Sequence, residues 1–319
     1  MSEFEVRPTI TVLGLGGAGC NTLNRLYEVG INVRTIAVHT EANHLRNVHA
    51  DEKILIGKPI CKGLGSGGNP AIGERAVKDD LDRLLNVIGR PNVLLVTGGL
   101  GGGTASGGMA PLLDAVADRF PDVIRIALVT IPFSWEGVAR INNARYGLTR
   151  ILEVADLTLV NLNDMLGKRI GSIPAQYAFK YADSLLTATI LDLIRIFTLP
   201  HTVSISFADF STVVRNAGLG CVGLGVGLRV NEAARTALNN VLLDAEIKEA
   251  NAALVYLQCP PETSLEDTSG AAKLLTEEYG LERVYWGLTL QEGLERNRVM
   301  ILASGVRSPT IEGLLGRAL

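Results

Sequence analysis

The chain has 319 residues, of which 47% are hydrophobic and 20% charged, and its formal net charge is −3. This composition is typical of a globular protein long enough to form two domains. The small negative charge, without any basic run, argues against nucleic acid as a partner, and no apolar run is long enough to span a membrane. Four scattered cysteines without a C-x-x-C pair predict reduced thiols and a cytoplasmic location.

Strands and helices alternate in the first half of the chain. Apolar, β-branched runs predict strands at 9–14, 33–38, 92–97, 123–131 and 157–162. Helical patterns predict helices at 19–30, 71–88, 106–119 and 137–153. Because the strand runs are continuously apolar rather than alternating, they indicate a parallel sheet buried on both faces by helices.

The second half begins with one long helical stretch at 175–198, which Pro200 ends. It is apolar on most sides after Tyr181, which favours burial between two bodies. A second α/β unit follows, with predicted helices at 209–217, 230–243 and 265–279 and predicted strands at 252–258, 283–290 and 298–304. Ser264 and Asp267 form a predicted capping pair for the helix at 265–279.

Three glycine-rich loops precede predicted helices: "GLGGAGCN" at 14–21, "GLGSGGNP" at 63–70 and "GGLGGGTASGG" at 98–108. In an open α/β sheet, ligands bind outside the carboxyl ends of the strands. Glycine lets backbone N–H groups approach phosphate oxygens, and a helix start adds the positive end of its dipole. One such loop is equally well explained as a tight turn. Three together predict a cradle for a phosphate chain.

A dinucleotide-binding oxidoreductase for NAD or FAD is the alternative from another class. Gly14, Gly16 and Gly19 satisfy G-x-G-x-x-G, and Glu41 follows at about the spacing of a ribose-binding acid. Such an enzyme has no use for the glycine loop at 98–108. It also needs a proton donor in a separate domain, and the second half offers no histidine besides His201.

Three histidines, His39, His44 and His49, recur every five residues. This spacing does not align them on one helix face, so it favours surface or loop histidines over a metal site. We therefore expect no metal ligands among the protein's side chains.

Spaced motifs, in a shared order, resemble segments of FtsZ. The stretch "GGGTASG" at 101–107 is similar to the tubulin/FtsZ signature G-G-G-T-G-[ST]-G, with Ala105 at the fourth glycine. "GLGGAGCNTLNRL", "GLGSGGNPAIG", "PFSWEG" with Arg140, "NLND" and "NEAAR" also resemble FtsZ segments, and the resemblance covers about 9–306. It implies a tubulin/FtsZ-like α/β fold whose subunits stack head to tail into filaments. The implied parts are a GTP-binding domain at 1–174, a central helix at 175–200, a smaller C-terminal α/β domain at 201–306 and a short tail at 307–319.

The resemblance also implies a site for GTP or GDP, with Mg²⁺ accompanying GTP. The α- and β-phosphates would contact Gly16, Gly17, Ala18, Gly19 and Asn21. The β/γ end would be wrapped by Gly101, Gly102, Gly103, Thr104, Ala105, Ser106 and Gly107. The γ-phosphate would lie near Thr40, Glu41, Gly67, Gly68 and Asn69. The ribose would be lined by Pro132, Glu136, Arg140 and Asn163. From the residues alone, Glu136 and Arg140 are equally an i,i+4 ion pair at a helix start.

The start of the long helix carries the implied base site. Phe179 and Asp183 are four residues apart and share a helix face. An aromatic ring can stack on a purine, and a carboxylate can accept from N1–H and the exocyclic amino group of guanine, a donor pair that adenine lacks. The residues alone also fit a core phenylalanine beside a solvated aspartate.

The loop "TVSISFADFST" at 202–212 departs from the family pattern. In FtsZ the corresponding loop reads N-x-D-F-A-D and completes the hydrolytic site of the neighbouring subunit. Here Ser204 and Ser206 replace the amide and the first carboxylate, and Asp209 remains as the implied catalytic residue. A serine hydroxyl cannot take a proton near neutral pH. We therefore expect a non-standard FtsZ-like protein that holds GTP and hydrolyses it slowly or not at all, the alternative being an active GTPase that works through Asp209 alone.

The tail "RSPTIEGLLGRAL" lacks the linker and adaptor-binding peptide of a typical FtsZ. Ile311, Leu314, Leu315 and Leu319 form a predicted apolar stripe, which favours a tail docked on the chain over one that contacts a membrane or a partner. We expect the protein to assemble with itself and to reach a membrane only indirectly or through this tail. The implied processes are cell division or membrane remodelling.

Overall fold

The computed structural model describes residues 7–170, 174–199 and 201–318. The chain forms two compact units, one from Pro8 to Thr187 and one that comprises Arg7 and the residues from Ala188 onward, and each is considered by itself. The division falls inside helix α9 (Ala175–Thr198), whose bounds match the predicted helix.

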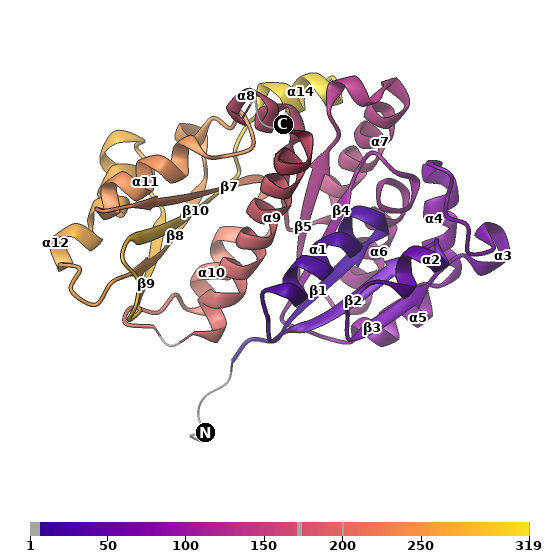
Figure 1. Cartoon of the computed structure of the whole chain (residues 1–319), viewed down its shortest axis with the longest axis horizontal. Helices are drawn as coiled ribbons and strands as arrows, with labels where there is room; N and C mark the ends of the chain where they lie inside the picture. The colour runs from indigo at the N-terminus through magenta and orange to yellow at the C-terminus, as the bar shows by residue number, and fades with distance from the viewer. Residues whose placement is uncertain (1–6, 171–173, 200, 319) are drawn as a thin grey trace. The chain divides into compact units, whose positions relative to one another are not determined.

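The first unit contains a parallel sheet in the order β3-β2-β1-β4-β5-β6 (Figure 1). Its strands are β1 (Ile10–Leu15), β2 (Arg34–His39), β3 (Glu52–Leu55), β4 (Val93–Gly99), β5 (Ile124–Ile131) and β6 (Leu157–Leu162). All six residues of β1 are buried, as expected of a central strand covered on both faces. The five predicted strands are confirmed, with ends shifted by up to two residues. The short β3 was not predicted.

Helices α1 (Gly16–Glu28), α4 (Pro70–Asp79), α5 (Leu81–Ile88), α6 (Gly103–Arg119) and α7 (Val138–Val154) complete this unit, with the shorter α2 (Ala42–Arg46), α3 (Lys58–Cys61) and α8 (Asn163–Ile170). The single helix predicted at 71–88 is wrong, because it divides at Asp80. The backbone there leaves the helical region, and the Asp80 carboxylate accepts a hydrogen bond from the Gly57 N–H at 2.8 Å.

The second unit contains a mixed sheet in the order β7-β10-β8-β9. Its strands are β7 (Gly218–Gly227), β8 (Ala252–Cys259), β9 (Val284–Leu290) and β10 (Asn297–Ser304). Strand β7 was not predicted, because "GLGCVGLGVG" resembles a loop. Its glycines allow close approach of α11 (Val230–Asn239): a Cβ on Gly223 or Gly225 would lie 2.0 Å from a backbone oxygen of that helix.

The remaining helices of this unit are α10 (Phe207–Val214), α12 (Leu265–Thr268), α13 (Gly270–Lys273) and α14 (Pro309–Leu315). The continuous helix predicted at 265–279 is wrong in detail, since α12, α13 and a π-helical turn at Leu274–Glu278 share that range. Its predicted cap is confirmed: the Asp267 N–H donates to Ser264 Oγ at 3.1 Å. The Asp267 carboxylate accepts from the Val230 N–H at the start of α11.

The tail docks on its own unit through α14. Ser308 caps the helix, and the Asp244 carboxylate accepts hydrogen bonds from the N–H and the hydroxyl of Thr310 at 3.0 and 2.7 Å. Ile311 of the predicted stripe is fully buried. Leu314 and Leu315 are half-buried, and Leu319 lies outside the described residues. Among the described helices, none is both long enough and apolar enough to cross a bilayer.

Candidate functional site

A cavity of about 540 Å³ lies at the carboxyl ends of the strands of the first unit. Fifteen of the predicted site residues line it: Gly16, Gly17, Ala18, Glu41, Gly67, Gly68, Gly101, Gly102, Gly103, Thr104, Ala105, Pro132, Glu136, Arg140 and Asn163. The structure adds residues that sequence reasoning missed: Leu15, His39, Leu64, Gly65, Ser66, Gly99 and Thr130. The fold therefore brings all three glycine loops to one cavity.

Two helices begin at this cavity without a side-chain cap. Helix α1 follows Leu15 and helix α6 follows Gly102, and neither residue carries a side-chain acceptor for the first N–H groups. Neither helix has an acidic residue in its first turn. The first N–H groups of a helix need acceptors, and the helix dipole favours an anion there. Two such starts at one cavity make a site for a polyanion.

The glycine loop at 63–70 ends differently. Asn69 caps α4, because its Oδ1 accepts a hydrogen bond from the Ala71 N–H at 2.9 Å. Asn69 does not line the cavity, although its neighbours Gly67 and Gly68 do. Both glycines have positive φ, at +58° and +73°, and nothing lies within 4 Å of the position of a Cβ. They shape an open loop that only glycine adopts at low cost.

Other glycines of the predicted phosphate loops serve packing instead. A Cβ on Gly19 would lie 2.3 Å from the backbone oxygen of Thr97, and one on Gly107 would lie 1.8 Å from that of Pro70. Neither glycine lines the cavity. Ser106 also lies away from the cavity, with its backbone against Gly147 of α7.

Three hydroxyl groups join the loops that form the cavity. The Thr104 hydroxyl at the start of α6 lies 2.9 Å from that of Thr40 and 3.2 Å from that of Ser66. Thr40 is fully buried and supports the site from below rather than lining it. This chain of hydrogen bonds fixes the end of β2, the loop before α4 and the start of α6 relative to one another.

One wall of the cavity carries an ion pair. Arg140 donates to the Glu136 carboxylate at 2.8 Å, four residues away, and Glu136 also accepts from the Phe133 N–H at 2.8 Å. The local i,i+4 pair is therefore confirmed; both residues also line the cavity, and their contact with a ribose stays a prediction. Arg140 is the cationic side chain of this wall.

The predicted base site lies in α9. Phe179 and Asp183 belong to this helix, but their side chains lie outside the described residues. Stacking and guanine recognition by these two residues therefore stay predictions.

His39 is the most informative residue that sequence reasoning missed. It ends β2, lines the cavity and is 7% exposed, and its Nδ1 accepts a hydrogen bond from the Glu41 N–H at 3.0 Å. Burial is the main cause that lowers the pKa of His39 to about 4; His44 adds to the shift and Glu41 opposes it. The signal for this role was its position at the carboxyl end of a buried strand, at the sheet edge where the glycine loops lie.

Asn21, which was predicted to meet the α- and β-phosphates, lies outside the cavity lining. Its Oδ1 lies 3.1 Å from Nε2 of His44. The amide therefore positions a histidine beside the cavity.

In the second unit, Ser206 and Asp209 form a reciprocal cap at the start of α10. The Asp209 N–H donates to Ser206 Oγ at 3.0 Å, and the Ser206 hydroxyl donates to Asp209 Oδ2 at 2.6 Å. Ser204 is exposed and Asp209 half-buried. The predicted catalytic carboxylate is thus hydrogen-bonded to its own helix start.

Comparison with known proteins assigns both halves of the chain. Residues 9–171 match the family model described as the Tubulin/FtsZ family, GTPase domain, and residues 218–307 match that of the FtsZ family, C-terminal domain. The chain is 37% identical over 310 residues to "Cell division protein FtsZ 1" of Pyrococcus woesei, covering 95% of this chain and 84% of that protein. Identity to the protein of the same name from Archaeoglobus fulgidus is 37% over 318 residues, covering 98% and 86%.

Solved structures show the same similarity. An empty FtsZ dimer of M. jannaschii superposes with a TM-score of 0.87 at 35% identity, covering 94% of this chain and 89% of that chain. A GTPγS-bound CetZ2 protofilament of Haloferax volcanii gives a TM-score of 0.86 at 22% identity, covering 97% and 96%. At that identity the second likeness shows the fold alone.

Proposed function

Because the chain belongs to the tubulin/FtsZ family, we propose that it binds GTP and GDP in the cavity of the first unit and assembles into filaments. The observation that carries this proposal is the convergence of two uncapped helix starts on one glycine-lined cavity. Its volume, about 540 Å³, lies in the range of small-molecule sites.

Topology alone does not exclude the dinucleotide alternative. The order β3-β2-β1-β4-β5-β6 is also that of a Rossmann sheet, so the fold fits either class of ligand. The second uncapped helix start, α6, has no counterpart in the G-x-G-x-x-G interpretation, and it favours a phosphate chain held from two sides. Family membership over both halves of the chain supports the same choice.

The residues of the cavity fit Mg²⁺ entering with the nucleotide. Magnesium prefers oxygen ligands and keeps several waters, so nucleotide phosphates usually supply much of its coordination. Ser66 and Thr104 place hydroxyl oxygens in the cavity lining. When bound, the ion neutralises phosphate charge, and we propose that these hydroxyls hold its waters.

Assembly is proposed to be head to tail, with the loop at 202–212 of one subunit meeting the nucleotide of the next. The dimeric M. jannaschii FtsZ, at 35% identity, supports self-association. With serines at 204 and 206, hydrolysis in this contact is proposed to be slow or absent, and Asp209 is the remaining carboxylate. The relatives named cell division proteins favour a role in cell division, with membrane remodelling as the second candidate.

The ligand can be identified directly. Denatured protein is expected to release GDP or GTP, and added guanine nucleotide is expected to raise the melting temperature, because a ligand that binds only the folded state stabilises it. ATP and NAD serve as controls and should leave the melting temperature unchanged. Chromatography of the released nucleotide and thermal denaturation measure these outcomes. Release of NAD or a flavin would contradict the proposed function.

Guanine selection is expected to depend on Asp183. The substitution Asp183→Ala removes the acceptor for the base while the phosphate-binding loops survive. Each lost charge-assisted hydrogen bond is worth about 1.5–3 kcal/mol, so GTP affinity should fall roughly tenfold or more. Competition by ITP and GTP for a labelled nucleotide measures this loss. Asp114→Ala, an exposed change on α6, is the matched control. Unchanged GTP affinity in Asp183→Ala would show that the carboxylate is only a surface charge.

A further inference from the structure

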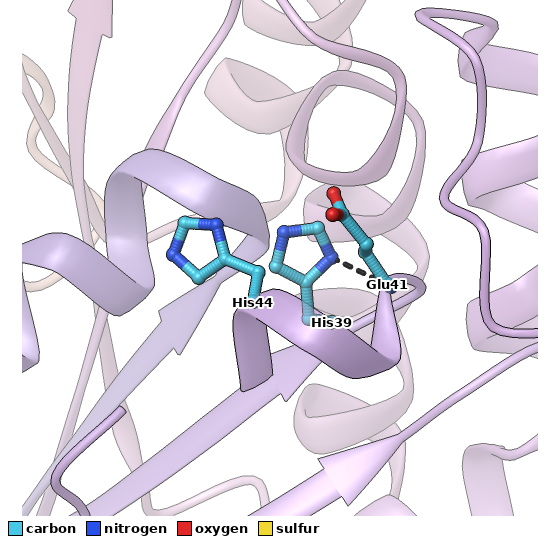
Figure 2. A group of neighbouring side chains, drawn as sticks. All are labelled: His39, Glu41 and His44. Atoms are coloured by element: carbon cyan, nitrogen blue, oxygen red, sulfur yellow. Dashed lines mark hydrogen bonds between the residues drawn. The ribbon is translucent and has the colours of Figure 1, made fainter. Parts of the chain in front are cut away.

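Beside the start of α1, three side chains from one short segment come together. His39 ends β2, Glu41 follows it and His44 lies in α2, and one ligating atom of each lies within 4.8 Å of the others. Figure 2 shows them side by side, with the ring of His39 in the middle of the view. Two imidazoles and a carboxylate suit either a transition-metal ion or, through N–H donors, an anion. The hydrogen bonds of the two rings distinguish these ligands.

The tautomer of His39 favours an anion. The Glu41 N–H donates to Nδ1 (the dashed line in Figure 2), so the proton of the neutral ring lies on Nε2. Nε2 lies 3.6 Å from the position of a Cβ on Gly17, which lines the cavity. A metal needs a lone pair on that nitrogen, whereas a phosphate oxygen needs the proton. A proton on Nδ1 of His39 would face the Glu41 N–H, so that two donors would meet with no acceptor between them.

His44 has the opposite arrangement. Its Nε2 faces the acceptor Oδ1 of Asn21 at 3.1 Å and so carries the proton of the neutral ring. Its Nδ1 therefore holds a lone pair, 3.7 Å from the same Cβ position on Gly17. His44 can take a second proton at Nδ1 and keep its bond to Asn21. An anion at Gly17 would favour that proton.

The charges around the two rings agree with a neutral His39 and a His44 that takes up the second proton. Burial and His44 keep the pKa of His39 low, so His39 is neutral at neutral pH. Glu41 and His39 are the titratable groups that face His44 within the cluster, and α1 contributes the neutral Gly17 and Asn21. Farther along the cavity lining lie Glu136 and Arg140, which pair with each other.

We propose that His39 and His44 clamp a nucleotide phosphate at the start of α1, His39 donating from neutral Nε2–H and His44 from an imidazolium Nδ1–H. The proposal rests on the proposed nucleotide site and adds to it a proton that His44 takes up when the nucleotide binds. One proton moves from the solvent to Nδ1 of His44 as the nucleotide binds. Because the complex then holds more protons than the free protein, nucleotide affinity falls as pH rises, by up to about tenfold per pH unit where a full proton is taken up.

The test is calorimetric titration of full-length, nucleotide-free protein with GDP at pH 7, in PIPES and in Tris buffer with EDTA, since phosphate buffer would compete for the site. The difference in heat between the buffers gives the number of protons taken up. We expect net uptake by the unmodified protein and near-zero uptake by His44→Gln, with an affinity loss of roughly tenfold for one charge-assisted hydrogen bond. His39→Gln should lose affinity and keep the uptake.

His49→Gln is the matched control, because His49 contacts Asn24 and lies outside the cavity lining. It should bind GDP as the unmodified protein does, and thermal denaturation checks that each variant is folded. Unchanged proton uptake in folded His44→Gln would overturn the proposal. So would stoichiometric binding of Co²⁺ that His44→Gln abolishes, since a metal would then occupy the cluster. Failure of the unmodified protein to bind GDP would instead overturn the proposed function.

Discussion

The double substitution Ser204→Asn with Ser206→Asp is expected to raise the rate of phosphate release from GTP by about 10²–10⁴-fold, the usual contribution of a positioned general base. The change restores the amide and the carboxylate that this loop lacks relative to the family pattern. A serine hydroxyl orients water but does not take its proton near neutral pH. Faster hydrolysis should also shorten the lifetime of filaments, because hydrolysis of GTP in the contacts between subunits loosens them.

The structure indicates that this variant will fold. Ser206 caps α10 by accepting from the Asp209 N–H, and aspartate is an equally good capping residue. The substitution also removes the hydroxyl that donates to Asp209 Oδ2, and repulsion between the two carboxylates turns Asp209 away from its own helix. The matched control is Ser204→Asn with Ser206→Asn, which keeps a cap but adds no carboxylate. It should remain as slow as the unmodified protein.

Phosphate release and light scattering, measured together over a concentration series, report hydrolysis and assembly. Activity that depends on contact between subunits should rise more steeply than linearly with protein concentration. Asp209→Ala should abolish the activity that remains in the unmodified chain. Fast turnover by the unmodified protein, unchanged by Asp209→Ala, would contradict this account of the loop. A protein that binds GTP but stays monomeric at every concentration would contradict the filament proposal alone.

The strands of the first unit could be predicted because burial on both faces leaves a continuous apolar run in the sequence. Strand β7 (Gly218–Gly227) could not, because its glycines record the close approach of α11, a helix that comes later in the chain. The same limit applies to the divided helix at Asp80, where the cause is a hydrogen bond to the distant Gly57. Local pattern records burial well, and it records backbone contacts between different elements poorly.

The candidate site shows this limit at single residues. The glycine loops and their convergence could be predicted, since parallel strands end at one edge of the sheet. Which glycines face the cavity could not, because Gly102 and Gly107 look alike in sequence and differ only in what lies beside them. His39 was missed for a related reason: its role depends on the Glu41 N–H, which fixes its tautomer.

The substitution Gly107→Ala is expected to destabilise the first unit by about 3 kcal/mol or more, at or above the upper end of the usual cost of overpacking. The added Cβ would lie 1.8 Å from the backbone oxygen of Pro70 and 2.7 Å from the backbone nitrogen of Glu74. Both atoms belong to α4, so no side-chain rotation relieves the clash, and α4 and α6 must move apart. Their separation would in turn disturb the glycine loops that join the helices to the cavity.

Gly102→Ala is the matched control from the same loop. Gly102 has φ −92°, a conformation that alanine adopts, and nothing lies within 4 Å of its Cβ position. This control should keep the free energy of unfolding and lose nucleotide affinity, because Gly102 lines the cavity. Urea denaturation monitored by circular dichroism measures the first quantity, and GDP titration the second. A Gly107→Ala protein as stable as the parent would show that α4 and α6 are not packed backbone to backbone, and would remove the distinction between packing and ligand-facing glycines on which the site rests.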